Sequence, residues 1–84
     1  MRGIIYYYSD FEVGINKLKE MVEQYNMMNI NTVKCHYKRW NSWAEFDNGD
    51  IWEVRYANDN ARGYRWNIAY IERCVPYDVF RCVI

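Results

Sequence analysis

The chain has 84 residues, of which 51% are hydrophobic, 11 are basic and 11 are acidic. The hydrophobic content argues against a disordered protein, and the neutral balance argues against a protein that coats nucleic acid with a positive excess or mimics DNA with a negative one. Three cysteines do not suit a secreted disulfide scaffold, and no secretion signal or membrane-spanning apolar run is visible. We therefore expect one cytoplasmic domain over residues 1–84, with reduced thiols and no membrane contact.

The N-terminal third predicts a strand followed by the main helix. Residues 3–8, GIIYYY, are β-branched or aromatic on both faces, as in a strand that is covered on both sides and often parallel. Ser9 with Glu12 three residues later predicts a capping box, and an apolar stripe at helical spacing predicts a helix from Asp10 to about Met28. Gly14 inside this helix costs about 1 kcal/mol relative to Ala, which suggests a close backbone contact there.

The middle of the chain predicts three further strands. Residues 33–38 alternate in polarity, which indicates a half-buried strand and, with the preceding strand and helix, a right-handed crossover unit. Residues 42–46 and 51–57 predict a hairpin closed by a type I′ turn at Asn48-Gly49. With this two-residue loop, one face of the hairpin collects four side chains, those of Trp43, Trp52, Val54 and Tyr56.

The last third predicts a loop, a strand and a short helical turn. Residues 58–65 have turn formers at both ends, residues 66–71 are nearly continuously apolar, and Pro76 opens a turn over residues 77–81. We therefore predict an α/β (α+β) fold in which a mixed sheet of about five strands carries one main helix. The predicted order is β-α-β-β-β-β plus a short C-terminal helical turn.

Three segments resemble the ATPase domain of phage terminase large subunits, the motors that package DNA. The segments FDNGD, ANDNARGYR and NIAYIER match a hairpin of the F-x-N-G-S type, a loop of the form A-x-x-N-A-R-G-x-R and the apolar strand that ends in the Walker B acid pair. Residues 75–84 also look like the family's continuation, and the N-terminal strand and helix fit more loosely. The resemblance implies phage ancestry and a piece of the motor's sheet kept as a scaffold.

The chain departs from this family at the residues that handle ATP. It has no G-x-x-x-x-G-K-[ST] loop to hold the β- and γ-phosphates and Mg²⁺. Glu72 and Arg73 stand at the positions of the acid pair, so a cation replaces the second, water-activating carboxylate. Nothing in the chain corresponds to the family's nuclease domain. We therefore expect a protein that is not an enzyme and uses no cofactor.

The loop over residues 58–65 is the strongest candidate binding site. Its two arginines can make bidentate contacts with carboxylate or phosphate, and loops at strand ends are where α/β sheets place ligands. The alternative is a structural ion pair of Arg62 with Asp59 or Glu72, inherited from the ancestor. Two tryptophans next to turns complete the set of predicted binding residues, which is Asn58, Asp59, Asn60, Arg62, Tyr64, Arg65, Trp40 and Trp43.

Aromatic and basic residues also suit a surface on which nucleic-acid bases stack. The aromatic residues near turns would meet the bases, while Lys34 and Lys38, beside the two loop arginines, would meet phosphates. The alternative is that aromatic residues at alternating positions of a small domain form its core, which we expect for Trp52 and Tyr56.

The cysteines offer a further but poorer site. Cys35, His36, Cys74 and Cys82 would supply thiolates and an imidazole to zinc, but they lack a C-x-x-C pair. Cys35 and His36 would also point to opposite faces of a strand, and a nucleophilic Cys-His pair would lack an orienting third group. We therefore interpret the cysteines as ordinary thiols and predict no metal site.

Three functional hypotheses follow. The first is a phage-type accessory protein that binds a host or phage protein complex, most concretely an anti-CRISPR-like inhibitor of a host defence nuclease, since its aromatic content suits an interface. The second is a nucleic-acid or nucleotide-binding module related to DNA packaging, or a sponge for a small signalling nucleotide, acting through Arg62 and Arg65. The third is a homo-oligomer that pairs through the apolar C-terminus, residues 79–84.

Overall fold

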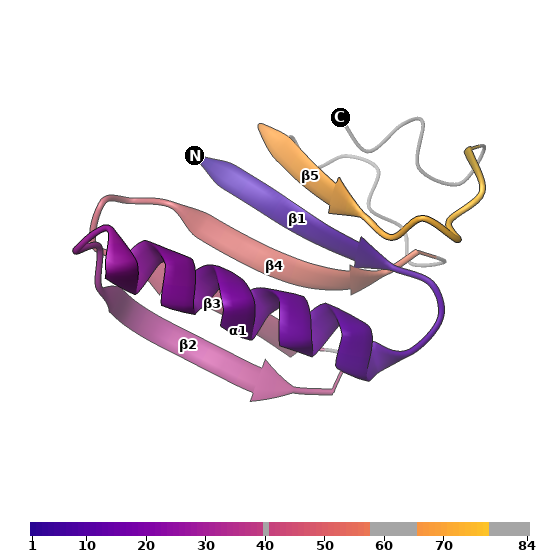
Figure 1. The fold of residues 1–84 in the computed structure, drawn as a ribbon, viewed down its shortest axis with the longest axis horizontal. Coiled ribbons are helices and arrows are strands. Elements are labelled where there is room, and N and C mark those ends of the chain that lie inside the picture. The colour runs from indigo at the N-terminus through magenta and orange to yellow at the C-terminus, as the bar shows by residue number, and fades with distance from the viewer. Residues whose placement is uncertain (40, 58–65, 78–84) are drawn as a thin grey trace.

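The protein forms one mixed β-sheet with a single long helix across one face (Figure 1). The computed structural model describes residues 1–39, 41–57 and 66–77. The predicted α/β (α+β) class is confirmed, with five strands and one main helix in the order β-α-β-β-β-β. Beyond Tyr77, the predicted C-terminal helical turn and the apolar C-terminus lie outside the described residues. The elements are β1 (Arg2–Tyr7), α1 (Phe11–Met27), β2 (Thr32–Lys38), β3 (Asn41–Phe46), β4 (Ile51–Tyr56) and β5 (Ile68–Ile71).

The strands follow the order β2-β3-β4-β1-β5 across the sheet. β1 is parallel to both of its neighbours, β4 and β5, whereas β2 with β3 and β3 with β4 form antiparallel pairs. Two antiparallel steps separate β4 from β2, so β2 runs in the same direction as β1. The crossover through α1 therefore passes β4 and β3 and places β2 at the edge of the sheet.

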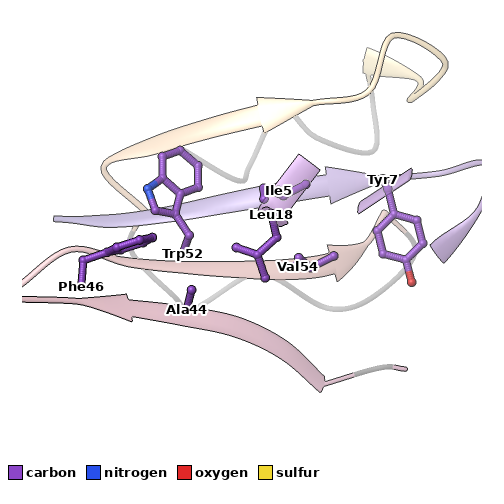
Figure 2. Packing of buried hydrophobic residues seen from close by; sticks show 7 residues of the cluster. All are labelled: Ile5, Tyr7, Leu18, Ala44, Phe46, Trp52 and Val54. Carbon is purple, nitrogen blue, oxygen red and sulfur yellow. The ribbon is translucent and has the colours of Figure 1, made fainter. Parts of the chain in front are cut away.

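β1 is buried on both faces because its side chains alternate between two hydrophobic clusters. Ile5 and Tyr7 belong to the cluster under α1, which we call the helix-side cluster and which Figure 2 shows. Ile4 and Tyr6 lie on the opposite, or far, face of the sheet and pack with Ala57, Trp66 and Val75. Full burial of a large apolar side chain contributes about 1.5–3 kcal/mol, so both clusters hold this strand in place. The helix-side cluster consists of Ile5, Tyr7, Leu18, Ala44, Phe46, Trp52 and Val54.

Helix α1 begins one residue later than the capping box predicts. Asp10 is the N-cap, with φ −146° and ψ 141°, and its carboxylate accepts a hydrogen bond from the Glu12 N–H at 3.2 Å. The predicted cap at Ser9 is wrong because the Ser9 hydroxyl donates instead to Glu72, at 2.6 Å. Within the described part of the chain, no helix is both long and apolar enough to cross a membrane.

The β3–β4 hairpin closes with a different turn from the predicted one. The Phe46 N–H donates to the Asp50 carbonyl at 2.8 Å, and the Gly49 N–H donates to the Phe46 carbonyl at 3.0 Å, so the loop has three residues instead of two. Of the loop residues only Gly49 has a positive φ, of 93°, which excludes a type I′ turn. The Asn48 side chain accepts from the Asp50 N–H at 3.0 Å and thereby stabilises the longer loop.

The longer loop shifts the hairpin register by one residue and moves Trp43 to the far face. Ala44 lies opposite Trp52 and Trp43 lies opposite Glu53, whereas the predicted register paired Trp43 with Val54. A one-residue slip exchanges the two faces of a strand. The predicted face of Trp43, Trp52, Val54 and Tyr56 is therefore wrong for Trp43, and Ala44 occupies the place under α1.

Gly14 lies where α1 packs tightly against the sheet. A Cβ at this position would be 2.6 Å from Cγ1 of Val54 and 2.9 Å from Cδ1 of Tyr7, both members of the helix-side cluster. Distances this short cannot be accommodated without a shift of a β-branched side chain or an aromatic ring. The close contact that the sequence suggested at this glycine is confirmed.

We predict that Gly14→Ala destabilises the protein by about 1–3 kcal/mol through overpacking, although Ala gains about 1 kcal/mol in helix propensity. Urea unfolding followed by circular dichroism measures the change. Asn16→Ala, at an exposed position of the same helix, is the control and should leave stability unchanged or slightly raised. Adding Val54→Ala to Gly14→Ala should cost less than the two separate losses added together. A stabilised Gly14→Ala variant would contradict the close packing.

Candidate functional site

The first candidate position for a site is at the C-terminal ends of the parallel strands β1, β4 and β5. β1 leads into α1 on one face of the sheet. Ala57 and Trp66, on either side of the next connection, pack on the far face. Open α/β sheets bind ligands at the carboxyl ends of two neighbouring parallel strands, where the chain continues to one face after one strand and to the other face after its neighbour.

The chain's own side chains fill this position. The Tyr8 and Tyr56 rings, which follow β1 and end β4, are stacked with centroids 6.1 Å apart and an interplanar angle of 3°. The Glu72 carboxylate, just after β5, lies at the start of α1. Its Oε1 accepts from the N–H groups of Tyr8 at 2.8 Å and Ser9 at 2.9 Å, and its Oε2 accepts from the Ser9 hydroxyl at 2.6 Å.

Glu72 thus takes the place that an anionic ligand would take. Successive backbone N–H groups next to a helix N-terminus form a common binding position for phosphates and other anions. The Ser9 hydroxyl, and after it the backbone N–H groups of Ser9 and Tyr8, lower the pKa of Glu72 from 4.5 to about 2, against the opposing effect of partial burial. The carboxylate is therefore charged at neutral pH and satisfies these donors itself.

Cys74 lies beside this carboxylate but is poorly suited to nucleophilic or metal chemistry. The hydrogen bond to Glu72, more than burial, raises the pKa of the exposed Cys74 thiol above its usual value of 9.0. The thiolate, not the thiol, is the form that attacks electrophiles and binds metals. This environment therefore favours the inert form.

The other described members of the predicted zinc and nucleophile sets lie elsewhere. Cys35 is exposed on β2, and Cys74 follows β5, at the opposite edge of the sheet. Cys35 lies opposite Ala44 and His36 lies opposite Trp43, so the two side chains point to opposite faces, as predicted. Cys82 lies outside the described residues. The structure therefore does not bring the described members, Cys35, His36 and Cys74, together.

Most of the predicted binding residues cannot be placed. Asn58, Asp59, Asn60, Arg62, Tyr64, Arg65 and Trp40 all lie outside the described residues, and so does any ion pair that involves Arg62. Trp43 is the described member of the set. It is half-buried on the far face, next to His36, with ring centroids 6.0 Å apart. Trp52 is buried and Tyr56 packs against the helix-side cluster, which confirms that both belong to the core.

β2 is the most exposed strand of the sheet. It has seven residues, pairs with β3 on one side, and ends the sheet on the other side among the described strands. Val33 is 60% exposed and Tyr37 is 38% exposed. The last residue of α1, Met27, is 84% exposed, and Met28, which begins the connection into β2, is 60% exposed. An apolar, unpaired strand edge is the kind of surface to which another polypeptide can add a strand.

The two sides of β2 differ in chemistry. Lys34, His36 and Lys38 lie opposite Glu45, Trp43 and Asn41 of β3, on the far face. The His36 Nδ1–H donates to the Asn41 carbonyl at 3.0 Å, because a carbonyl can only accept. Tyr37 lies on the helix side, where the Lys19 ammonium is 5.6 Å from its ring centre. We call Val33, Lys34, His36, Tyr37 and Lys38 the β2 edge surface.

No protein-family model, curated protein or solved structure matches the chain.

Sequence reasoning did not identify the β2 edge surface as a site. It considered Lys34 and Lys38 only as phosphate contacts, because alternation shows that a strand has two faces but not that it lies at an edge. It also missed the bonds between Ser9 and Glu72. The signal available was a serine and a glutamate at the ends of two predicted strands, which become neighbours once β1 and β5 are known to pair.

We predict that Glu72→Gln lowers stability at neutral pH by about 1–2 kcal/mol. The hydrogen bonds from Ser9 and Tyr8 would then end on a neutral amide instead of a charged carboxylate. The folded-state pKa of Glu72 lies below the unfolded one, so its contribution is present above the unfolded pKa. It is lost as pH falls from about 4.5 to about 2. Urea unfolding at several pH values should show the difference between wild type and variant shrinking over this range.

Glu23→Gln is the matched control, since Glu23 is exposed on α1. Its effect should stay within about 0.5 kcal/mol at every pH. A difference in stability between wild type and Glu72→Gln that does not change with pH would show that the charge of Glu72 does not stabilise the fold.

Proposed function

We propose that the protein is a non-enzymatic accessory protein of phage type that acts by binding another protein in the cytoplasm of the host. The most concrete form of the proposal is an inhibitor of a host defence nuclease complex, in the manner of anti-CRISPR proteins. The resemblance of three segments to the ATPase domain of terminase large subunits belongs to the same proposal, as the origin of the scaffold. The β2 edge surface is the observation that carries it.

The edge strand supports protein binding because it offers contacts that need no cleft. Strands rise about 3.3 Å per residue, so the seven residues of β2 present an edge about 23 Å long. A strand added there would form backbone hydrogen bonds along this length, and exposed side chains such as Val33 and Tyr37 would add contact area. Tyrosine is one of the residue types that most often anchor interfaces.

The filled anion position supports a role without ATP hydrolysis. A phosphate bound next to α1 would have to displace Glu72 from the N–H groups of Tyr8 and Ser9. The carboxylate would then lose its donors and lie close to a second negative charge. The sequence lacks the glycine-rich phosphate loop and has Arg73 in place of the second acid. Both features favour binding over phosphoryl chemistry.

A nucleic-acid or nucleotide-binding module related to packaging, including a sponge for a small signalling nucleotide, is the alternative. The observation that favours it is the row of Lys34, His36 and Lys38 on the far face, with Trp43 beside His36. Basic residues next to an aromatic ring suit a single-stranded backbone and its bases. This alternative requires an affinity that falls steeply with salt and depends on Arg62 and Arg65.

Affinity capture from infected host lysate tests the proposed function. We expect the tagged full chain to retain one protein complex in stoichiometric amount, and nuclease treatment of the lysate should not reduce the yield. Tyr37→Asp together with Val33→Asp should lower it strongly, whereas Asn16→Asp on the exposed side of α1 should not. Recovery of no stoichiometric protein, with tight binding of a nucleotide or of single-stranded nucleic acid instead, would favour the alternative.

A further inference from the structure

We infer, building on the proposed protein-binding function, that β2 accepts an extended segment of the partner as a sixth strand and that this segment alternates acidic and apolar side chains. The exposure of β2 alone does not specify the chemistry of the partner. The different character of the two faces of the β2 edge surface does.

The far face of β2 carries two lysines, and only one of them, Lys34, lies opposite an acidic residue of β3. Lys34, His36 and Lys38 recur at every second residue, about 6.6–6.8 Å apart along the strand. Lys34 and Lys38 are exposed. Glu45 lies opposite Lys34 in the register, but among the described residues no ion pair joins them. The next acidic group inward, Glu53, is already paired with Arg2 at 2.7 Å and with Arg55 at 3.1 Å.

An added strand would therefore meet two lysine ammonium groups on this face, at Lys34 and Lys38, with the His36 ring between them. Opposite charges on neighbouring strands stabilise a pair by about 0.2–1 kcal/mol, and like charges directly opposite destabilise it. Glu or Asp at alternate positions of the incoming segment matches the spacing of Lys34, His36 and Lys38.

The helix side of β2 selects apolar residues at the intervening positions. Cys35 and Tyr37 lie on this side, in register with Ala44 and Ser42. Tyr37 is partly exposed beyond the Lys19 ammonium that covers one part of its ring. Aromatic and β-branched side chains form favourable cross-strand pairs. Val, Ile or Thr in the partner would therefore extend the apolar surface on the helix side.

The same residues oppose a second copy of this chain as the occupant. Antiparallel pairing of two β2 strands centred on His36 would place Lys34 of each chain opposite Lys38 of the other, on one face, and like charges directly opposite are destabilising. Edge lysines and bulges are devices that proteins use against edge-to-edge association, and β2 has both, with a register shift between Thr32 and Lys34. A surface that rejects its own sequence and fits an acidic one gains specificity from both effects.

Synthetic peptides test this inference on the full chain. One peptide, about nine residues long so that it spans β2, alternates Glu with Val and Thr; the matched peptide has Lys in place of each Glu. In titrations followed by amide NMR, we expect the Glu peptide to shift and protect the amides of β2. The Lys peptide should bind about tenfold more weakly, a factor that two cross-strand charge pairs supply when attraction is replaced by repulsion.

Three variants of the experiment separate strand addition from simple charge attraction. Lys34→Glu with Lys38→Glu should reverse the preference between the two peptides. Lys17→Glu with Arg73→Glu makes the same change in net charge near β5, the edge strand on the opposite side of the sheet from β2. This variant should preserve the preference for the Glu peptide. Two Glu peptides N-methylated along one edge or the other should differ, because only one edge of an added strand meets β2.

Equal binding of both peptides, amide shifts away from β2, or a preference that survives Lys34→Glu with Lys38→Glu would overturn the inference. So would self-association of the chain through β2, detected by light scattering and removed by Val33→Asp. Lysate capture distinguishes the two proposals. A partner retained equally by wild type and by Lys34→Glu/Lys38→Glu, without a preference for the Glu peptide, overturns the acidic strand and leaves protein binding standing. A clear Glu preference with no captured partner supports the acidic strand and counts against the proposed function.

Discussion

The burial of β1 on both faces is the constraint on which the rest of the arrangement depends. Ile5 and Tyr7 need cover on the helix side, and Ile4 and Tyr6 need cover on the far face. A helix is about 10–12 Å across and strands are about 4.8 Å apart, so one helix covers little more than two strands of a sheet. α1 makes most of its contacts with β1 and β4. β2 is left exposed at the edge because α1, the one long helix among the described residues, buries the strands at the centre.

Two carboxylates hold α1 in this position, one near each end. Glu72 bonds to Ser9 just before the helix begins. Near the other end, the Tyr25 hydroxyl donates to Asp50 at 2.7 Å and accepts from the Trp52 indole N–H at 3.0 Å. The Tyr25 hydroxyl, more than the groups around it, lowers the pKa of Asp50, and the pKa of Glu72 is lowered as well. Both carboxylates are charged at neutral pH, so each hydrogen bond to them is charge-assisted and stronger than a neutral one.

The sequence predicts those parts of the fold that depend on local periodicity. The unbroken run GIIYYY and the apolar stripe of α1 identify a buried parallel strand and its covering helix. The hairpin shows where such reasoning stops. Asn-Gly suits both a two-residue and a three-residue loop, and the hydrogen bonds of Asn48 and Phe46 with Asp50 decide between them. That one-residue difference sends Trp43, a predicted binding residue, to the far face. The β2 edge surface depends on strand order, which arises from the packing of the whole chain and is not encoded in any one segment.

The proposed origin in a motor domain and the proposed protein-binding function are compatible because the two roles use different parts of a sheet. A motor works at the ends of its parallel strands, where backbone N–H groups hold phosphates; here Glu72 satisfies those groups. Recognition by strand addition works along the edge and needs only unpaired backbone and suitable side chains. A domain of 84 residues has little volume in which to enclose a ligand, whereas its edge strand is long relative to its size. The lysines of β2 then have two consequences at once, since the charge that keeps two copies of the chain apart also favours an acidic partner.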